Sequence, residues 1–378
     1  MKQIPQIYEA TASAIDGYAL GSLPDALECK VTEERNGEFF LQMTYPANGL
    51  NAILIRVGRI IGALPDMYGS MQGFRIATIT KALDGTMEIT AYHVSYDLAQ
   101  VIVMPFTAAT LDLALAGLEA NAVPANGFSL SSDMTKTATF TVTEPTPLRS
   151  LLVGMEGSLV DVYGGELRFN NWEVELLSSR GQSRNVQIAY GKNLTDFKET
   201  DEIAAYDAVV PFAVWNETTY TLTDTTTYPT APIVYADGSG ALYGYPKTIP
   251  LDLSDKFSEN EPTEAELYAY AQSYIAKNSV DPSVHFATEY LDLAKLIGNV
   301  ERVDLCDTVY ITVLPFNVQN LTAKVISVTY NVLLDENDEV KIGDRKITLA
   351  DTLAETIIAT ERKTGTQIGL RNADATRY

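Results

Sequence analysis

The chain has 378 residues, 46% of them apolar, which is long enough for roughly two to four domains with well-buried cores. It carries 49 acidic and 27 basic residues, for a net charge of −22. This balance excludes the extended basic patches with which nucleic-acid-binding proteins neutralise phosphate. Since no run of 18 apolar residues occurs, the sequence also predicts no membrane-spanning helix.

The N-terminus indicates the cellular compartment in which the chain folds, and this compartment decides whether the two cysteines stay reduced. The N-terminus has neither the basic start nor the apolar core of a signal peptide, which predicts synthesis and folding in a cytoplasm. Thiols stay reduced there, so Cys29 and Cys306, each in a strand-like run, are predicted to be buried free thiols. Their spacing excludes a cysteine-based zinc site.

Strand signals dominate the first 94 residues. Runs such as Leu27–Thr32, Phe39–Tyr45 and Met87–Tyr92 are short and are separated by turns rich in Gly, Asp and Pro. Many short strands with such turns are typical of a small barrel or sandwich. We therefore predict a first β-barrel domain over residues 1–94.

After residue 94 the apolar period changes to that of a helix. Thr110–Asn121 places Leu111, Leu115 and Leu118 on one helix face. This helix and the strand that follows it predict an α+β domain over residues 95–190.

The predicted α+β domain ends in three apolar runs. These are Leu167–Phe169, Trp172–Leu176 and Val186–Tyr190. The turn pair Asn170–Asn171 and a polar loop separate them, and the pattern predicts a three-stranded meander.

Strands and one helix are predicted in the rest of the chain. Thr263 and Glu266 have the spacing of a capping box, and a helix follows to about Asn278. We predict a discontinuous second β-barrel over residues 191–238 and 296–345, an α+β insert over 239–295, and a C-terminal part over 346–378. The last part holds a helix near 349–362, capped by Thr348, and a tail.

Two segments resemble each other weakly. In 57–79 and again in 303–328, a strand ends in a proline-containing loop and a second alternating strand follows. The similarity is low enough to arise by chance between two barrels. A true repeat would let three subunits present six equivalent barrels to a partner of sixfold symmetry.

Candidate chemical groups are scarce. His93 and His285, about 190 residues apart, are predicted to be structural or surface residues rather than catalytic bases. The sequence lacks the nucleophile elbow of hydrolases and the paired histidines of zinc proteases. Tyr163–Gly165 is predicted to be a turn and 335–339 a solvated hairpin tip rather than a calcium loop. We therefore predict no catalytic, cofactor-binding or metal-binding residues, and no cofactor.

Tyrosines are frequent, with 21 in the chain. Two groups, Tyr243–Tyr245 and Tyr268, Tyr270 and Tyr274, suit either a sugar-binding surface or a contact between subunits.

Three ordered motifs resemble those of one family. The central one comprises Asp161, the run 163–166, Arg180–Gly181, Arg184 and the run 190–194. The others are Ala91–Leu98 and Val303–Val309. Together they resemble the N-terminal hub region of phage tail proteins, the prophage endopeptidase tail or tail-associated lysin proteins. The resemblance covers about residues 20–345.

The resemblance implies a mainly β fold with α+β insertions, in which two small tube-like barrels and α+β domains assemble as a trimeric ring. Members of this family are similar in fold to the central hub of contractile-tail baseplates. It implies a non-enzymatic virion protein, built in the host cytoplasm, that closes the tail tube, adapts sixfold to threefold symmetry and forms a channel. Expected partners are two further copies, the distal tail protein, the tape-measure protein, the tail tube and a tip spike, fibre or lysin. DNA would pass without specific binding.

Two other functions remain open at the sequence level. One is a tail-associated enzyme that cleaves peptidoglycan, and the other is a carbohydrate-binding adhesin that uses the tyrosine-rich insert. Many relatives continue into an endopeptidase, lysin or stalk, whereas this chain stops at Tyr378. We therefore expect any such part to be a separate polypeptide attached near the C-terminal helix.

Overall fold

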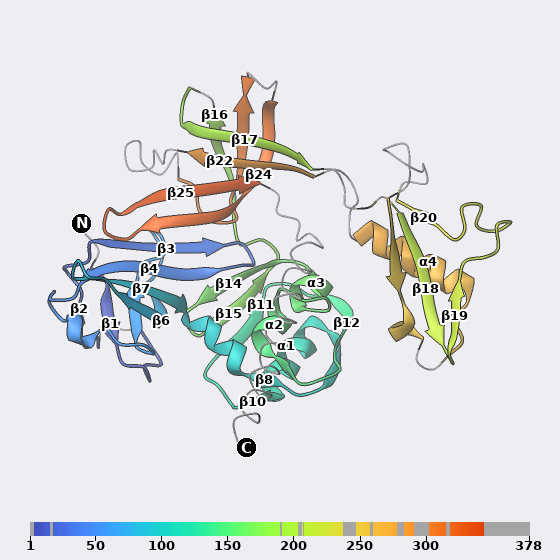
Figure 1. The fold of residues 1–378 in the computed structure, drawn as a ribbon, viewed down its shortest axis with the longest axis horizontal. Coiled ribbons are helices and arrows are strands. Elements are labelled where there is room, and N and C mark those ends of the chain that lie inside the picture. The colour runs from blue at the N-terminus through green and yellow to red at the C-terminus, as the bar shows by residue number, and fades with distance from the viewer. Residues whose placement is uncertain are drawn as a thin grey trace, which may run out of the picture. The chain divides into compact units, whose positions relative to one another are not determined.

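A computed structural model describes most of the chain (Figure 1). The described residues are 4–15, 18–189, 191–202, 206, 208–236, 247–257, 260–277, 283–290, 302–314 and 318–343. Internal contacts divide the chain into two compact units: residues 1–197 with 286–378 form unit 1, and Lys198–His285 form unit 2. The finer five-part subdivision stays a prediction, and the C-terminal helix predicted near 349–362 lies outside the described residues.

One large sheet organises unit 1. It has 11 strands in the order β16-β23-β24-β3-β4-β7-β6-β5-β1-β2, and β25 pairs with β24. Its strands are β1 Gln6–Tyr8, β2 Gly21–Ser22, β3 Glu28–Glu34, β4 Phe39–Pro46, β5 Ile60–Ala63, β6 Gln72–Lys81, β7 Thr86–His93, β16 Ser183–Ala189, β23 Thr308–Val313, β24 Val318–Asn331 and β25 Glu336–Gly343. A short 3-10 helix, η1 Ala52–Leu54, lies between β4 and β5.

The central strands form because their side chains alternate between core and solvent. In β3, Cys29 and Val31 point into the core, and in β4, Phe39, Leu41 and Met43 do the same. In the described part of unit 1, the two larger clusters of buried apolar side chains are separate. One lies beneath β1–β7 and the helices of unit 1, and the other among β16, β23, β24 and β25.

The prediction of a mainly β fold is confirmed, but closed barrels are not what the described strands form. The long strand β24 explains the difference. Its first part, as far as Lys324, pairs with β23, and its second part, Ser327–Asn331, pairs with β3. The edge that would close a second barrel is thus already bonded to the first sheet, and both merge into one open path.

The segment after β7 adds helices and small sheets. Helices are η2 Val94–Gln100, α1 Leu111–Ala120, α2 Leu148–Leu152 and α3 Leu159–Tyr163; strands are β8 Ile102–Val103, β9 Phe106–Thr110, β10 Ala122–Val123, β11 Ser129–Ser132, β12 Thr137–Val142, β13 Thr146–Pro147, β14 Glu166–Asn170 and β15 Glu173–Leu177. The predicted helix over Thr110–Asn121 is confirmed as α1, which buries Leu111, Leu115 and Leu118.

The prediction of a three-stranded meander is confirmed for its first two strands and wrong for the third. β14 and β15 form the expected hairpin, with Asn171 in the left-handed region at its turn. The third run, β16, instead leaves this hairpin and pairs in parallel with β23 of the large sheet (Figure 1). Its partner lies more than a hundred residues later in the chain, so local alternation could not reveal it.

Unit 2 is a small sheet with one helix. β18 Ala208–Trp215 is the central strand, and β19 Thr218–Thr221, β20 Val234–Tyr235 and β21 Thr248–Asp252 pair with it. Helix α4 Glu264–Lys277 packs its Leu267 and Ala271 into the core, and η3 Ser254–Lys256 precedes it. The paired strands β17 Leu194–Glu202 and β22 Ser283–Tyr290 carry the chain between the units.

The predicted capping box at the start of α4 is confirmed. The Thr263 backbone N–H donates to Glu266 Oε2 at 3.1 Å, and the Glu266 N–H donates to Thr263 Oγ1 at 3.3 Å. We expect Thr263→Ala to destabilise unit 2 by about 1 kcal/mol, because an N–H of the first turn loses its acceptor.

The measurement for this variant is urea denaturation followed by Trp215, in a Trp172→Phe background that silences the other of the chain's two tryptophans. Glu266→Gln is the matched control, since its amide oxygen can still accept. An unchanged midpoint in Thr263→Ala would mean that the box is not formed in solution.

Candidate functional site: a polar cleft where two sequence motifs meet

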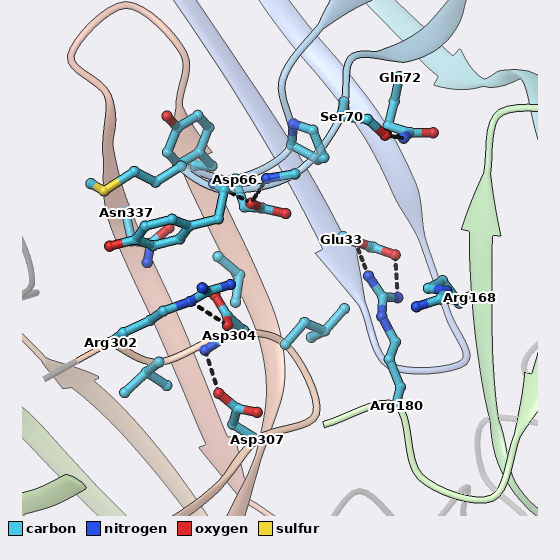
Figure 2. A pocket seen from close by; sticks show the side chains of 18 of the residues that line it. Glu33, Asp66, Ser70, Gln72, Arg168, Arg180, Arg302, Asp304, Asp307 and Asn337 are labelled. Atoms are coloured by element: carbon cyan, nitrogen blue, oxygen red, sulfur yellow. Dashed lines mark hydrogen bonds and ion pairs between the residues drawn. The ribbon is translucent and has the colours of Figure 1, made fainter. Parts of the chain in front are cut away.

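A cleft of about 530 Å³ opens on unit 1. Charged and amide side chains line most of it (Figure 2). They come from β3, the β5–β6 loop and the start of β6, β14, the segment around the start of β16, the loop before β23, and β25: Glu33, Asp66, Ser70, Gln72, Arg168, Asn170, Arg180, Gln182, Arg184, Arg302, Asp304, Asp307 and Asn337. Two motifs singled out from the sequence, around residues 180–184 and 303–309, therefore lie side by side here.

A buried ion pair joins the central motif to the large sheet. Arg180 donates from Nη1 and Nη2 to the two carboxylate oxygens of Glu33, at 2.5 and 2.9 Å (Figure 2). The side chains are only 17% and 10% exposed. Burial alone would lower the pKa of Arg180, but the attraction and hydrogen bonds of Glu33 raise it above its usual value. The pair therefore fixes the loop before β16 to β3, a strand far away in the sequence.

Gly181 is where the chain crosses the loop before β23. A Cβ added at this position would overlap the carbonyl group of Cys306 and the backbone nitrogen of Asp307. Only glycine permits so close an approach of two backbones. The crossing is fixed on both sides, because Gln182 N–H donates to Asp307 Oδ1 at 2.6 Å and Thr308 N–H donates to the Gln182 carbonyl at 2.9 Å.

Arg184 completes this crossing. Its Nε donates to Asp307 Oδ2 and its Nη2 to Asp304 Oδ2, both at 3.0 Å. Asp307 Oδ2 also accepts from the Asp304 backbone N–H at 2.9 Å. The two motifs are thus one hydrogen-bonded assembly that sets β16 in register beside β23.

Arg302 lines another part of the cleft. Its guanidinium lies 3.8 Å from the centre of the Tyr68 ring, a cation–π contact. Its Nε lies 2.6 Å from Asp304 Oδ2, an ion-pair contact whose angle falls outside hydrogen-bond geometry. Burial raises the pKa of Asp304, and Asp307 and Asp66 add to this effect while Arg302 opposes it.

His93 sits in a second buried polar group. Its Nε2 lies 3.2 Å from Gln72 Oε1, so this nitrogen carries the proton and Nδ1 accepts from the Ser95 backbone N–H and hydroxyl. Arg149 donates to the Ser95 hydroxyl at 3.0 Å. The ring stacks on Phe39. Since His93 and Ser95 are fully buried, they hold the end of β7 in place and cannot reach a substrate.

Burial, and then the charges of Arg149 and Arg180, hold the pKa of His93 well below its usual value. The folded-state pKa is therefore below the unfolded one. As the pH falls through about 6.5, His93 becomes protonated in the unfolded chain but stays neutral in the folded protein. We expect this histidine to lower the free energy of unfolding by up to about 1.4 kcal/mol for each pH unit below that point.

The measurement for His93 is urea denaturation at pH 7 and pH 5. His93→Gln keeps a donor and an acceptor but does not titrate. Its loss of stability between the two pH values should be smaller than that of the wild type. Parallel losses would contradict a buried neutral histidine.

The cysteines do not supply a nucleophile. Both are buried free thiols, as predicted. Burial raises the pKa of Cys306 to about 12, and it raises that of Cys29 as well. Neither thiol is ionised at neutral pH, so neither has the thiolate that attacks a carbonyl.

Other candidates also have structural roles. In the hairpin at 335–339, Tyr330 donates to Asp335, and Lys30 pairs with Asp338 at 3.1 Å. Gly164 and Gly165 form a turn with positive φ, as predicted. Within the described ranges, no group of three His, Cys, Asp or Glu side chains is placed to hold a metal ion. No described helix is long and apolar enough to span a membrane.

Sequence reasoning missed the ion pair of Glu33 and Arg180. One signal was present, because Glu33 occupies the core-facing phase of β3, where Cys29 and Val31 precede it. A charge in an apolar phase indicates a buried partner. The predicted His285 has no described side chain, and Tyr243–Tyr245 lie outside the described residues. The Tyr268 ring packs at a tilt against the Tyr228 ring inside unit 2, with their centres 4.7 Å apart.

Comparison with known proteins relates part of the chain to one family. Residues 182–353 match the family described as prophage endopeptidase tail. No curated protein sequence matches the chain.

Three solved tail proteins share the fold. The prophage tail protein gp18 of Listeria monocytogenes EGD-e has a TM-score of 0.55 at 12% identity, over 95% of this chain and 99% of its own. The Neisseria meningitidis MC58 tail protein has 0.56 at 7%, over 92% and 97%. The 43 kDa tail protein of prophage MuSo2 from Shewanella oneidensis has 0.58 at 11%, over 91% and 98%. The resemblance predicted from the sequence is confirmed: residues 182–353 match the prophage endopeptidase tail family, and the chain shares the fold of solved phage tail proteins.

Proposed function

We propose that this chain is a structural hub at the tip of a phage tail, where three copies close the tail tube and form a channel. The observation that carries the proposal is the likeness in fold to solved tail proteins over nine-tenths or more of the chain, together with the family match. Relatives of this kind are tail components. The hub position, the trimer and the channel are our inference.

The polar cleft supports a structural role rather than catalysis. Its carboxylates are bound by arginines and backbone N–H groups that tie β3, β16 and β23 together. A hub must transmit mechanical force between neighbouring rings while its channel opens. Buried, bidentate ion pairs suit this task because they fix the relative register of distant strands. This argues against the peptidoglycan-cleaving alternative.

A DNA passage should not hold phosphate, and the solvent face of the central strands suits this. Its positions include Thr32 on β3, Gln42 and Thr44 on β4, and Thr90 on β7. Lys30, a basic residue on this face, is neutralised because it pairs with Glu28 at 2.7 Å. With a net charge of −22, the protein would repel DNA rather than bind it.

The proposed partners follow from this position: two further copies, the distal tail protein and tail tube above, the tape-measure protein in the passage, and a spike, fibre or lysin below. The test is electron microscopy of particles that carry the chain, with gold-labelled antibody against it. Label confined to the tail tip supports the hub. Label along the tube or at the head end would overturn it. Clearing of host cell walls by the pure protein would favour the enzymatic alternative.

A further inference from the structure

Two loops of unit 1 carry the same four residues. Pro46–Gly49 and Pro124–Gly127 both read Pro-Ala-Asn-Gly, and Asn36–Gly37 is a third Asn-Gly pair in the sequence. An asparagine that precedes glycine is prone to lose its side-chain amide, because glycine has no side chain to shield the backbone nitrogen that attacks it. Since the two loops are identical in sequence, only their folded surroundings can separate the reactivity of their asparagines.

The loss of the amide is a reaction of the chain with water. The glycine backbone nitrogen gives its proton to water and bonds to Cγ of the asparagine. The bond from Cγ to Nδ2 then breaks, and Nδ2 leaves as ammonia after taking up a proton. Water opens the resulting succinimide ring to aspartate or isoaspartate, so water is consumed and ammonia released without any redox step. The reaction is favoured by a glycine N–H that no acceptor holds, by open space around it, and by a donor to Oδ1, where negative charge develops.

Asn126 meets all these conditions. It and Gly127 are exposed in the loop between β10 and β11 (Figure 1). A Cβ added at Gly127 would have nothing within 4 Å. Among the residues that the structure describes, the Gly127 N–H has no acceptor. The Phe128 N–H donates to Asn126 Oδ1 at 3.0 Å, so a donor already lies at the atom that becomes negatively charged.

This donor is fixed from the C-terminal side of the loop. The Phe128 side chain packs against the core beneath β1–β7, and the Ser129 N–H donates to the Trp172 carbonyl at 3.0 Å. The hydrogen bond from Phe128 to Asn126 also closes a ring of atoms that includes the Gly127 nitrogen. Cγ of Asn126 is therefore kept on the side of the nitrogen that must attack it.

The identical sequence around Asn48 has different surroundings. The Gly49 N–H donates to the Pro46 carbonyl at 3.0 Å, and the Gly49 carbonyl accepts from the Ala52 N–H at 3.1 Å. A Cβ added at Gly49 would lie 2.7 Å from the ring of Tyr45, which is fully buried. The Gly49 peptide is thus fixed in a turn, and its N–H is held by an acceptor that must be released before the nitrogen can attack.

Asn36 is held by its side chain. Its Nδ2 donates to the Gly165 carbonyl at 3.0 Å, and its Oδ1 accepts from the Leu167 N–H at 2.7 Å. The Gly37 N–H donates to the Glu34 carbonyl at 3.1 Å. Loss of Nδ2 as ammonia would therefore break contacts that tie the loop between β3 and β4 to the start of β14.

We propose that Asn126 is a site of spontaneous covalent modification, at which water converts the amide to aspartate and isoaspartate, while Asn36 and Asn48 stay intact in the folded protein. Each event adds one negative charge to the loop between β10 and β11. Because Asn126 and Gly127 are exposed, the fold is expected to persist after the change. The inference does not depend on the hub position or on the trimer.

The test is peptide mapping by mass spectrometry of the purified full chain after incubation in neutral buffer. Digestion in mild acid prevents further reaction, and fragmentation of each peptide localises the change. In the folded protein, the mass gain of amide-to-acid conversion should appear at Asn126 at least about tenfold faster than at Asn36 or Asn48. In guanidinium chloride, Asn48 and Asn126 should react at nearly equal rates, because their local sequences are the same.

Gly127→Ala is the matched variant. Its Cβ shields the backbone nitrogen without meeting any neighbour, so modification of Asn126 should slow about tenfold while circular dichroism stays unchanged. Equal rates at Asn48 and Asn126 in the folded protein would overturn the proposal. So would an intact Asn126 over a period in which the unfolded chain reacts, or a rate in Gly127→Ala equal to that of the wild type.

Discussion

Replacing Gly181 by alanine is expected to lower the free energy of unfolding of unit 1 by at least about 3 kcal/mol. The added Cβ would overlap the backbone of Cys306 and Asp307. A backbone neighbour cannot turn away as a flexible side chain can, so β16 and the loop before β23 would have to separate. The hydrogen bond from Gln182 N–H to Asp307 would break with them.

The measurement is urea denaturation followed by Trp172 in a Trp215→Phe background, so that only unit 1 reports. Gly127→Ala is the matched control, because a Cβ there would have nothing within 4 Å. The control should change stability by less than about 1 kcal/mol. Equal effects of the two substitutions would contradict the crossing of β16 over this loop.

Breaking the ion pair of Arg180 and Glu33 should cost about 3–5 kcal/mol. In Arg180→Met the carboxylate of Glu33 stays buried without its bidentate partner. The double variant Arg180→Met/Glu33→Met removes both charges and should recover most of the loss, because an apolar pair of similar size satisfies the site.

The matched control is Arg168→Met. Arg168 pairs with Glu175, but its side chain is 46% exposed. The loss should stay below about 1 kcal/mol, because solvent screens this pair. The readout is again Trp172 in the Trp215→Phe background. A double variant no more stable than Arg180→Met would show that shape rather than charge sets the energy of this site.

Local patterns predicted the elements well. The spacing of Leu111, Leu115 and Leu118 placed α1, and the box of Thr263 and Glu266 placed the start of α4. Both signals depend on residues three or four apart, so the sequence carries them directly. The burial of both cysteines likewise followed from their strand-like surroundings.

Long-range pairing was not predictable from such patterns. β16 pairs with β23, and β24 with β3, across long stretches of chain, and alternation gives only the face of a strand and not its neighbour. For this reason the expected meander and closed barrels became one open sheet. The motifs at 180–184 and 303–309 were found only as a family resemblance, and their physical reason, the shared cleft, needed the structure.

A threefold hub has a defined symmetry, which can be seen at the tail tip. We would determine by electron cryomicroscopy the structure of the distal end of tails that carry this chain. We expect three copies in one ring directly beneath the sixfold tube. Density for six copies, or for this fold anywhere other than the tube's end, would contradict it.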